Sequence, residues 1–234
     1  MMKDRVKDIV IGLGADLCGV ANAEDFKEAP SGFHPLDIFE GCRSVVVLAK
    51  RMPKGSARVG PRIVYNRANE MNIFEVDRIA FTAALEMEKL GLTAVPLPAD
   101  SPYDQWDEDS MRGQGILSMR HAAVLAGLGR LGRNTLVINR ELGNMMTIGA
   151  ILIDLDLESD PRAENLCPEK CRRCLENCPV LALNGVSVDQ KRCRLNTYET
   201  NARGFGVINC NICRTGCPWA LGLKSIDNPD KPAA

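Results

Sequence analysis

The stretch Cys167-Pro-Glu-Lys-Cys171-Arg-Arg-Cys174-Leu-Glu-Asn-Cys178-Pro179 places four thiols within twelve residues. Eight of the ten cysteines of this 234-residue chain lie between residues 167 and 217, at one end of an otherwise ordinary composition. So dense a group indicates either disulfides or a metal centre. A chain with a normal apolar core does not need disulfides in a reducing compartment, so the pattern favours metal.

A second motif, Cys210-Asn-Ile-Cys213-Arg-Thr-Gly-Cys217-Pro218, repeats the C-x3-C-P ending, and Cys193 precedes it. Bacterial ferredoxins hold two [4Fe–4S] clusters with a C-x2-C-x2-C-x3-C-P run whose fourth cysteine ligates the other cluster. The same crossing predicts two complete ligand sets in this chain. One set is Cys167, Cys171, Cys174 and Cys217, and the other is Cys178, Cys193, Cys210 and Cys213.

Two departures from the ferredoxin run predict a variant of that fold. The first gap is three residues instead of two, and Cys193 stands apart from its partners. Ser187 and Gln190 have the spacing of a capping box that opens a helix carrying Cys193. The main alternative is two structural zinc sites, which usually show separated C-x2-C pairs and do not require the C-x3-C-P repeat. Cys18 and Cys42, the remaining cysteines, are expected to be buried small apolar residues.

The charge and hydropathy of the whole chain limit the classes of partner that we expect. With 29 basic and 30 acidic residues the net charge is −1, so no overall positive field would gather nucleic acid, and we do not expect nucleic acid as a partner. The apolar runs are far shorter than the roughly 20 residues of a membrane span, so we expect no membrane association. Acidic residues interrupt a faint signal-peptide pattern at the N-terminus, and we therefore expect a cytoplasmic protein.

The N-terminal part alternates helices and strands, which predicts an α/β (α+β), sandwich-like domain. The expected helices cover residues 2–13, 69–90 and 118–126, and the expected strands cover 17–21, 44–49, 92–97, 135–138 and 146–154. Residues 52–66 and 98–115 are expected to be irregular loops. A charged stretch with a proline, 156–164, indicates a boundary. We thus expect an α/β domain over 1–160, a bacterial-ferredoxin-like two-cluster module over 161–223 and a flexible tail over 224–234.

The run Gly127-Leu-Gly129-Arg-Leu-Gly132 matches the G-x-G-x-x-G pattern of dinucleotide-binding loops. That fingerprint must follow a strand and open a helix. Here a predicted helix precedes the glycines and a predicted strand follows them, so the context is inverted. A helix end followed by a tight turn is the simpler interpretation.

The same run, in the longer stretch from Arg120-His121 to Thr135, resembles a turn of the epoxyqueuosine reductase and reductive dehalogenase superfamily. In that superfamily an A-G-L-G-x-x-G turn precedes a strand end like Ile151-Leu-Ile-Asp154 and a double-cluster ferredoxin module. The resemblance also includes Gly14–Val20 and Ser44–Leu48, and it covers nearly the whole chain. It marks the chain as a short, divergent member.

This resemblance implies that the α/β domain binds cobalamin next to the proximal cluster, whose electrons reduce the cobalt and, through it, a substrate above the corrin. It implies cofactor-binding roles for residues at and before the glycine turn: Arg120, His121, Gly127, Gly129 and Gly132. No catalytic residue is assigned.

The sequence departs from the family in three respects. The chain is shorter than epoxyqueuosine reductases, and we expect it to lack the C-terminal helical domain that helps them to engage tRNA. The position of their catalytic aspartate aligns with Gly113, and acids occur only nearby, over residues 107–109. A basic position of the dehalogenases reads Asn144-Met145-Met146.

The sequence therefore supports three kinds of function. The first is a redox protein whose two [4Fe–4S] clusters pass electrons one at a time between a donor or acceptor protein and a cofactor. The second is a cobalamin-dependent reductase of a small molecule, with a site where residues 103–109, Arg120 and His121 approach the cluster of Cys167, Cys171, Cys174 and Cys217. The third is a binding module in which the clusters are purely structural.

Overall fold

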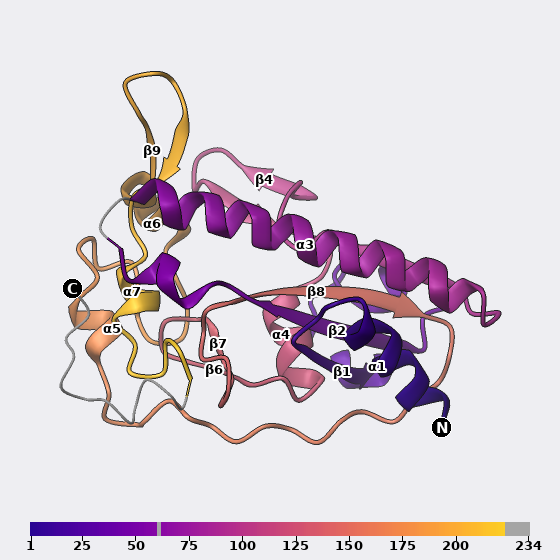
Figure 1. Ribbon diagram of the computed structural model, residues 1–234. Helices are drawn as coiled ribbons and strands as arrows, with labels where there is room; N and C mark the ends of the chain where they lie inside the picture. Colours follow the sequence, from indigo (N-terminus) through magenta and orange to yellow (C-terminus); the bar gives the residue numbers. More distant parts are fainter. Residues whose placement is uncertain (60–61, 223–234) are drawn as a thin grey trace.

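A four-stranded antiparallel sheet forms the middle layer of the N-terminal part (Figure 1). The computed structural model describes residues 1–59 and 62–222. Every neighbouring pair of strands is antiparallel, and β2 pairs along its full length with β8. The strands follow one another across the sheet in the order β1 (Leu17–Asn22), β2 (Ser44–Arg51), β8 (Met146–Ile153) and β3 (Ala94–Leu97).

The central strands are buried on both faces, and their side chains divide between two cores. In β2, Val45, Val47 and Ala49 belong to one apolar cluster, whereas Val46 and Leu48 belong to the other. Successive strand side chains point to opposite faces, so apolar elements must cover both sides of the sheet. The unbroken apolar run of this strand is typical of such a position.

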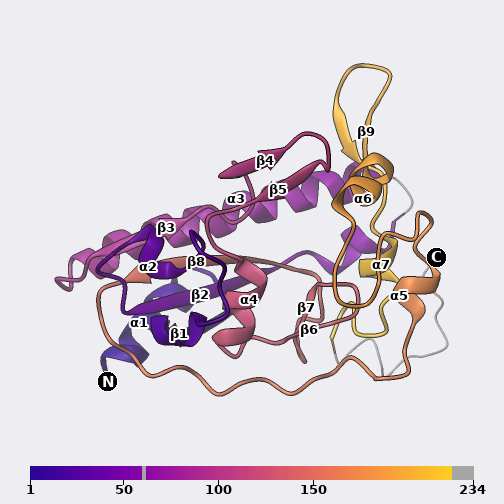
Figure 2. The same ribbon diagram turned by 180° about the vertical axis from the view of Figure 1, so that it is seen from behind.

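Helices on both faces complete the layers (Figure 2). The helices α1 (Met2–Gly12) and α3 (Arg62–Glu88) each pack one side against the cluster that contains Val46 and Leu48. The opposite cluster contains residues of α4 (Met119–Leu125) and of the short helices η1 (Ala23–Phe26) and α2 (Pro35–Ile38). The mixed α/β class expected from the sequence is confirmed, with an antiparallel sheet.

Most of the expected elements of this domain are confirmed, but α3 is longer than expected. The predicted loop 52–66 contains the 3-10 helix η2 (Lys54–Ala57), and α3 begins at Arg62, about two turns before the predicted start. Tyr65 and Asn66, in the added turns, are buried. The Asn66 side chain accepts a hydrogen bond from the Ile208 N–H at 3.0 Å. Contacts with the distant C-terminal part thus stabilise turns that local sequence does not reveal.

Two small hairpins also differ from the expectations. The predicted loop 98–115 contains β4 (Gln105–Asp107) paired with β5 (Arg112–Gln114). The predicted strand 135–138 is reduced to β7 (Val137–Ile138), which pairs with β6 (Arg130–Leu131). Strands this short contain too few residues to show an alternating pattern.

The cysteine-rich part lies at one end of the sandwich (Figure 1). It comprises α5 (Arg173–Glu176), α6 (Gln190–Thr197), a hairpin of β9 (Tyr198–Thr200) with β10 (Gly206–Ile208), and α7 (Ile212–Thr215). The expected helix carrying Cys193 is confirmed as α6. Its cap is Asp189, whose side chain accepts from the Arg192 N–H at 3.0 Å, so the predicted capping box of Ser187 and Gln190 is wrong.

The segment between the two parts runs back over the surface of the α/β domain. Asp160 on this segment forms ion pairs with Lys3 at 2.7 Å and Lys7 at 2.8 Å, and it accepts from the Val20 N–H at 3.0 Å. The Asn22 side chain donates to the Leu157 carbonyl at 3.1 Å. The stretch predicted as a boundary is therefore bound to the domain along its length.

A third apolar cluster joins the cysteine-rich part to the α/β domain. Met52, Tyr65 and Met145 pack there against Ala220 and Leu221. The tail predicted over residues 224–234 lies outside the described residues. Among the residues that the structure describes, no helix is long and apolar enough to cross a membrane.

Candidate functional site

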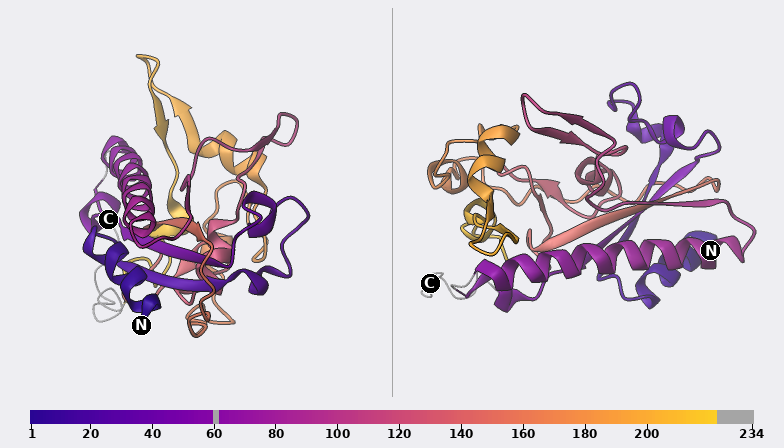
Figure 3. Two further views of the ribbon diagram at one scale, coloured as in Figure 1. Left: turned by 90° about the vertical axis from the view of Figure 1, so that its right-hand side faces the viewer. Right: turned by 90° about the horizontal axis from the view of Figure 1, so that it is seen from above.

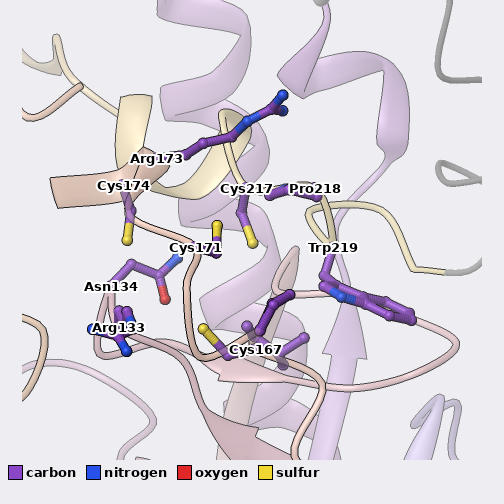
Figure 4. Close-up of a pocket in the computed structure, with 11 residues that line it drawn as sticks. Arg133, Asn134, Cys167, Cys171, Arg173, Cys174, Cys217, Pro218 and Trp219 are labelled. Carbon is purple, nitrogen blue, oxygen red and sulfur yellow. The ribbon is translucent and has the colours of Figure 1, made fainter. Parts of the chain in front are cut away.

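The structure gathers Cys167, Cys171, Cys174 and Cys217 around one pocket (Figure 4). Three of them come from the first motif and one from the second. Arg133 and Asn134, which follow the glycine turn, line the same pocket. These four cysteines are the first ligand set expected from the sequence, and we call this space the first cysteine pocket.

The other four expected ligands line a second space, a broad cleft of about 1120 Å³. Cys178 comes from the first motif, and Cys193, Cys210 and Cys213 come from α6 and the second motif. The structure thus gathers the members of each set into one group, in the crossed arrangement expected from the sequence, although some members of a set are far apart in sequence.

Two similar turns produce the crossing. Cys174 lies on α5 and Cys213 on α7, and each of these one-turn helices is followed by the cysteine-proline pair that ends its motif. The two helices pack against one another. Each final cysteine, Cys178 or Cys217, is therefore delivered to the neighbouring set.

Buried amide side chains of the α/β domain hold the α7 segment in place. Asn134 donates to the Cys213 carbonyl at 2.9 Å, and Asn144 donates to the Arg214 carbonyl at 3.2 Å. Both asparagines are almost fully buried. They fix the second motif against the domain because their hydrogen bonds are shielded from water.

Both groups of donors are thiols, the ligand type by which proteins hold iron–sulfur clusters. Burial raises the pKa of the Cys213 and Cys217 thiols to about 11, so these groups stay protonated at neutral pH unless a cation binds them. Across residues 1–59 and 62–222, no group of three or more His, Cys, Asp or Glu side chains could hold a metal ion. Ligation of a cluster by either set is therefore taken up below as a proposal.

Polar and charged side chains line the cleft beside Cys193 and Cys213. Arg120 Nη1 donates to the Thr135 carbonyl at 3.1 Å and to its hydroxyl at 3.0 Å. The surrounding protein desolvates this guanidinium and lowers its pKa, as does the charge of Arg214, but an arginine remains protonated. His121 Nδ1 lies 2.7 Å from the Ser118 hydroxyl.

This arrangement corrects one expectation. Arg120 and His121 were expected to approach the cluster of Cys167, Cys171, Cys174 and Cys217, but they line the cleft of the other set. Of the expected segment 103–109, only Tyr103 lines the cleft, because the following residues form the β4–β5 hairpin. The hairpin binds α6, and this contact brings Cys193 to the cleft.

Residues of α6 are bonded to the β4–β5 region at three points. Arg194 Nη2 donates to the Tyr103 hydroxyl at 3.1 Å, and its guanidinium lies 5.1 Å from the centroids of the Tyr103 and Trp106 rings. Tyr103 and Trp106 are stacked, with centroids 6.0 Å apart. Lys191 donates to the Asp109 carbonyl at 2.7 Å, and Gln190 bonds to Gly113. Helix α6 therefore has a fixed place at the cleft.

The glycines of the turn have a packing role in the structure. Neither the first cysteine pocket nor the cleft is lined by Gly127, Gly129 or Gly132, although a cofactor-binding role was expected for them. Gly127 has φ +75°, and a Cβ there would lie 2.3 Å from the Pro161 carbonyl oxygen. A Cβ on Gly129 would lie 2.4 Å from the Ile138 carbonyl oxygen. The absence of a side chain at Gly127 and Gly129 therefore allows the backbone of neighbouring segments to pack closely against the turn.

Asp100, Arg194 and Tyr198 line the cleft but were missed by the sequence analysis. Desolvation raises the pKa of the Asp100 carboxyl, against the opposing effect of Arg194 and Arg120. Desolvation also raises the pKa of Tyr198. The one available signal was that Arg194 is adjacent to Cys193, an expected ligand. Asp100 lies in a stretch that the sequence predicted as an irregular loop.

Known proteins resemble this chain in sequence. No protein-family model matches it. The epoxyqueuosine reductase of Lactococcus garvieae is 32% identical over a stretch covering 52% of this chain and 37% of that protein. The epoxyqueuosine reductase of Bacillus anthracis is 25% identical over 93% of this chain and 64% of that protein. The chain therefore spans only part of the length of these curated relatives.

Solved structures share the fold. The epoxyqueuosine reductase from Streptococcus thermophilus has a TM-score of 0.64 at 18% identity, covering 94% of this chain and 66% of that one. A reductive dehalogenase, whose structure suggests a mechanism for B12-dependent dehalogenation, has a TM-score of 0.70 at 18% identity, covering 94% and 32%. An epoxyqueuosine reductase solved with a tRNA stem loop has a TM-score of 0.62, covering 94% and 65%.

These sequence and structural relatives match the superfamily that the glycine turn and the cysteine motifs indicated. The chain thus resembles the epoxyqueuosine reductases in sequence, and it shares its fold with epoxyqueuosine reductases and with a reductive dehalogenase.

Proposed function

We propose that the protein is an iron–sulfur redox protein that carries two [4Fe–4S] clusters and passes electrons to a cofactor or partner bound at the cleft. Its relatedness to epoxyqueuosine reductases and reductive dehalogenases supports a reductase. The observation that carries the proposal is the gathering of the eight cysteines of the C-terminal part into two groups of four.

The two proposed clusters have different surroundings. Cys167, Cys171, Cys174 and Cys217 would hold the first cluster beside Arg133 and Arg173. Cys178, Cys193, Cys210 and Cys213 would hold the second at the cleft, beside Arg120. Electrons would enter at the first cluster and leave at the second, because the second faces the large cleft that can accommodate a ligand.

Residues of the chain also tune the second cluster. The Ala182 N–H donates to the Cys178 sulfur at 3.3 Å, and the Cys193 sulfur lies 3.6 Å from the Thr197 hydroxyl oxygen. Hydrogen bonds to the ligand sulfurs and nearby positive charge favour the reduced form of a cluster. Arg120 supplies that charge, and among residues 1–59 and 62–222 no carboxylate lies at hydrogen-bond distance from its guanidinium.

The alternative is a cobalamin-dependent reductase of a small molecule. The volume of the cleft exceeds the roughly 300–1,000 Å³ that is usual for sites of drug-sized ligands, as a macrocyclic cofactor requires. When bound, a corrinoid supplies a cobalt centre that can be reduced and transfer electrons to a substrate. Arg120, His121 and Tyr198 would hold it, and Asp100 would orient or protonate a substrate.

Metal analysis of anaerobically purified protein tests the main proposal. We expect about eight iron and eight sulfide per chain, with a visible absorption that bleaches on reduction. Stoichiometric zinc without sulfide would show instead that the thiols form structural zinc sites. The double variant Cys18→Ala/Cys42→Ala is the matched control, since neither thiol lines either group, and its iron content should equal that of the wild type.

Titration with cobalamin separates the alternative from the main proposal. If the cleft binds a corrinoid, the cluster-loaded protein should form a stoichiometric complex and unfold at a higher temperature with the ligand than without it. Absence of cobalamin binding at tens of micromolar, with both clusters intact, would exclude the cobalamin-dependent reductase and be consistent with the electron carrier.

Nucleic acid is a further candidate substrate class, against our expectation from the overall charge. A structural neighbour is solved with a tRNA stem loop. Fluorescence anisotropy with a labelled RNA stem loop tests this. Saturable binding that is weakened by Arg112→Ala or Lys191→Ala, at the rim of the cleft, would support an RNA substrate. Absence of RNA binding at low salt would exclude an RNA substrate.

A further inference from the structure

The long helix α3 has apolar side chains on its outer face, away from the sheet. Phe74 and Phe81 are 61% and 60% exposed, and Met71, Val64 and Leu85 are 42% to 44% exposed. Figure 3 shows α3 along the edge of the molecule. A soluble monomer seldom exposes several large apolar side chains in one row.

Eight of the exposed positions of α3 fall in two rows with a seven-residue repeat. One row is Val64, Met71, Arg78 and Leu85, and the other is Arg67, Phe74, Phe81 and Glu88. All eight residues are exposed, while the buried residues of α3, such as Val76, Ile79 and Ala83, lie on the opposite side of the helix. Two interleaved seven-residue rows, three and four residues apart, form the seam along which a helix packs against another helix.

We propose that this seam is a homodimer interface, in which α3 packs antiparallel against α3 of a second copy of the chain. The 27 residues of α3 give a helix about 40 Å long, and the seam runs along nearly all of it. The five exposed apolar side chains offer roughly 450 Å² per copy, and the exposed parts of Arg67, Arg78 and Glu88 add to this area, so the two copies together reach about the lower limit of a stable interface.

The charged residues favour the antiparallel direction, in which the seam is complementary to itself. In a parallel pair Arg67 and Arg78 would each face the same arginine of the partner, which is unfavourable. In the antiparallel pair centred near Val76, Phe74 faces the partner's Arg78, Met71 faces the partner's Phe81, and Arg67 lies near the partner's Leu85 and Glu88. Each basic residue of the seam then meets an aromatic ring, an apolar side chain or an acid.

Sedimentation equilibrium of the anaerobic, cluster-loaded protein tests the interface. We expect a mass of twice 25.6 kDa at micromolar concentration. Phe81→Glu should raise the dimer dissociation constant at least tenfold. The matched control is Leu36→Glu, because Leu36 is 46% exposed on α2, which lies on the opposite face of the sheet from α3. A wild-type mass of 25.6 kDa at all concentrations would contradict the proposal.

A charge exchange gives a second test that does not depend on an apolar substitution. Arg67→Glu should weaken the dimer by placing an acid near the partner's Glu88. The double variant Arg67→Glu/Glu88→Arg should restore it, because the pair is only reversed. Equal weakening in the single and double variants would overturn the antiparallel register. Iron content and circular dichroism equal to those of the wild type would verify that the variants fold.

Discussion

Gln190 and Gly113 exchange two hydrogen bonds: the Gly113 N–H donates to Gln190 Oε1 at 3.0 Å, and Gln190 Nε2 donates to the Gly113 carbonyl at 3.4 Å. Gln190 opens α6, the helix of Cys193, and Gly113 lies on β5. A Cβ on Gly113 would also lie 2.8 Å from the Tyr103 ring, so this glycine admits both neighbours. One contact thus couples a proposed cluster ligand to the rim of the cleft.

Gln190→Ala should loosen the β4–β5 hairpin without unfolding the protein. Loss of the two hydrogen bonds should cost about 1–2 kcal/mol of local stability. Hydrogen exchange of the amides over residues 105–114 should accelerate severalfold. Gln105→Ala, an exposed change on the paired strand, is the control and should leave exchange unaltered. Unchanged exchange in Gln190→Ala would mean that other contacts hold the hairpin.

Gly127→Ala should destabilise the protein whether or not a cofactor is bound. The substitution forces a side chain into a left-handed conformation and against the Pro161 carbonyl, which should cost at least about 2 kcal/mol of unfolding free energy. Gly12→Ala is the contrast, because open space surrounds that position in α1 and it should be neutral or stabilising. Denaturant melts of the two variants measure the difference; equal stability would refute the packing role of the turn.

Acid should weaken the attachment of residues 156–164 to the α/β domain, which depends on the ion pairs of Asp160 with Lys3 and Lys7. Burial alone would raise the pKa of Asp160, but hydrogen bonds from Lys3, Lys7 and the Val20 amide outweigh it and leave the pKa below its usual 3.8. Because the folded pKa is below the unfolded one, the contribution to stability is complete above about pH 4 and disappears as the pH falls through the folded pKa. Asp160→Asn should therefore be less stable than the wild type at pH 6, and the gap should narrow at lower pH. A gap that is independent of pH would exclude an ionic contribution.

Removal of the Arg120 charge should lower the reduction potential of one cluster only. Arg120 interacts electrostatically with Cys193 and Cys213, so Arg120→Gln should make the second cluster harder to reduce, on the order of tens of millivolts. The first cluster should keep its reduction potential, because Arg120 does not line the first cysteine pocket. Redox titration followed by electron paramagnetic resonance resolves the two. Equal shifts in both clusters would indicate a general structural effect.

Local sequence predicted those parts of the fold in which pattern and environment agree. The apolar run of β2, the amphipathic α1 and the spacing of the cysteines each specify structure over a few neighbouring residues. The added turns of α3 and the β4–β5 hairpin were missed because residues more than 70 positions away stabilise them, through Asn66 with Ile208 and Gly113 with Gln190.

The candidate site shows the same division. Cysteine spacing indicated the membership of both groups, but which group faces Arg120 depends on how α6 docks, and no local pattern encodes that. The cofactor-binding role that the resemblance implies for the glycine turn stays a prediction, and the close approach of Gly127 to Pro161 and of Gly129 to Ile138 gives these glycines a packing role as well. Likewise, the side-chain contacts of Asp100 and Arg194 depend on tertiary structure.

The crossed ligation is tested most directly by electron paramagnetic resonance of single-cysteine variants prepared without oxygen. Cys217→Ser should alter the same cluster signal as Cys171→Ser, although Cys217 lies in the second motif, and should leave the signal altered by Cys210→Ser intact. Cys178→Ser should alter the same signal as Cys210→Ser. If Cys217→Ser instead alters the signal altered by Cys210→Ser, each motif holds its own cluster and the account is wrong.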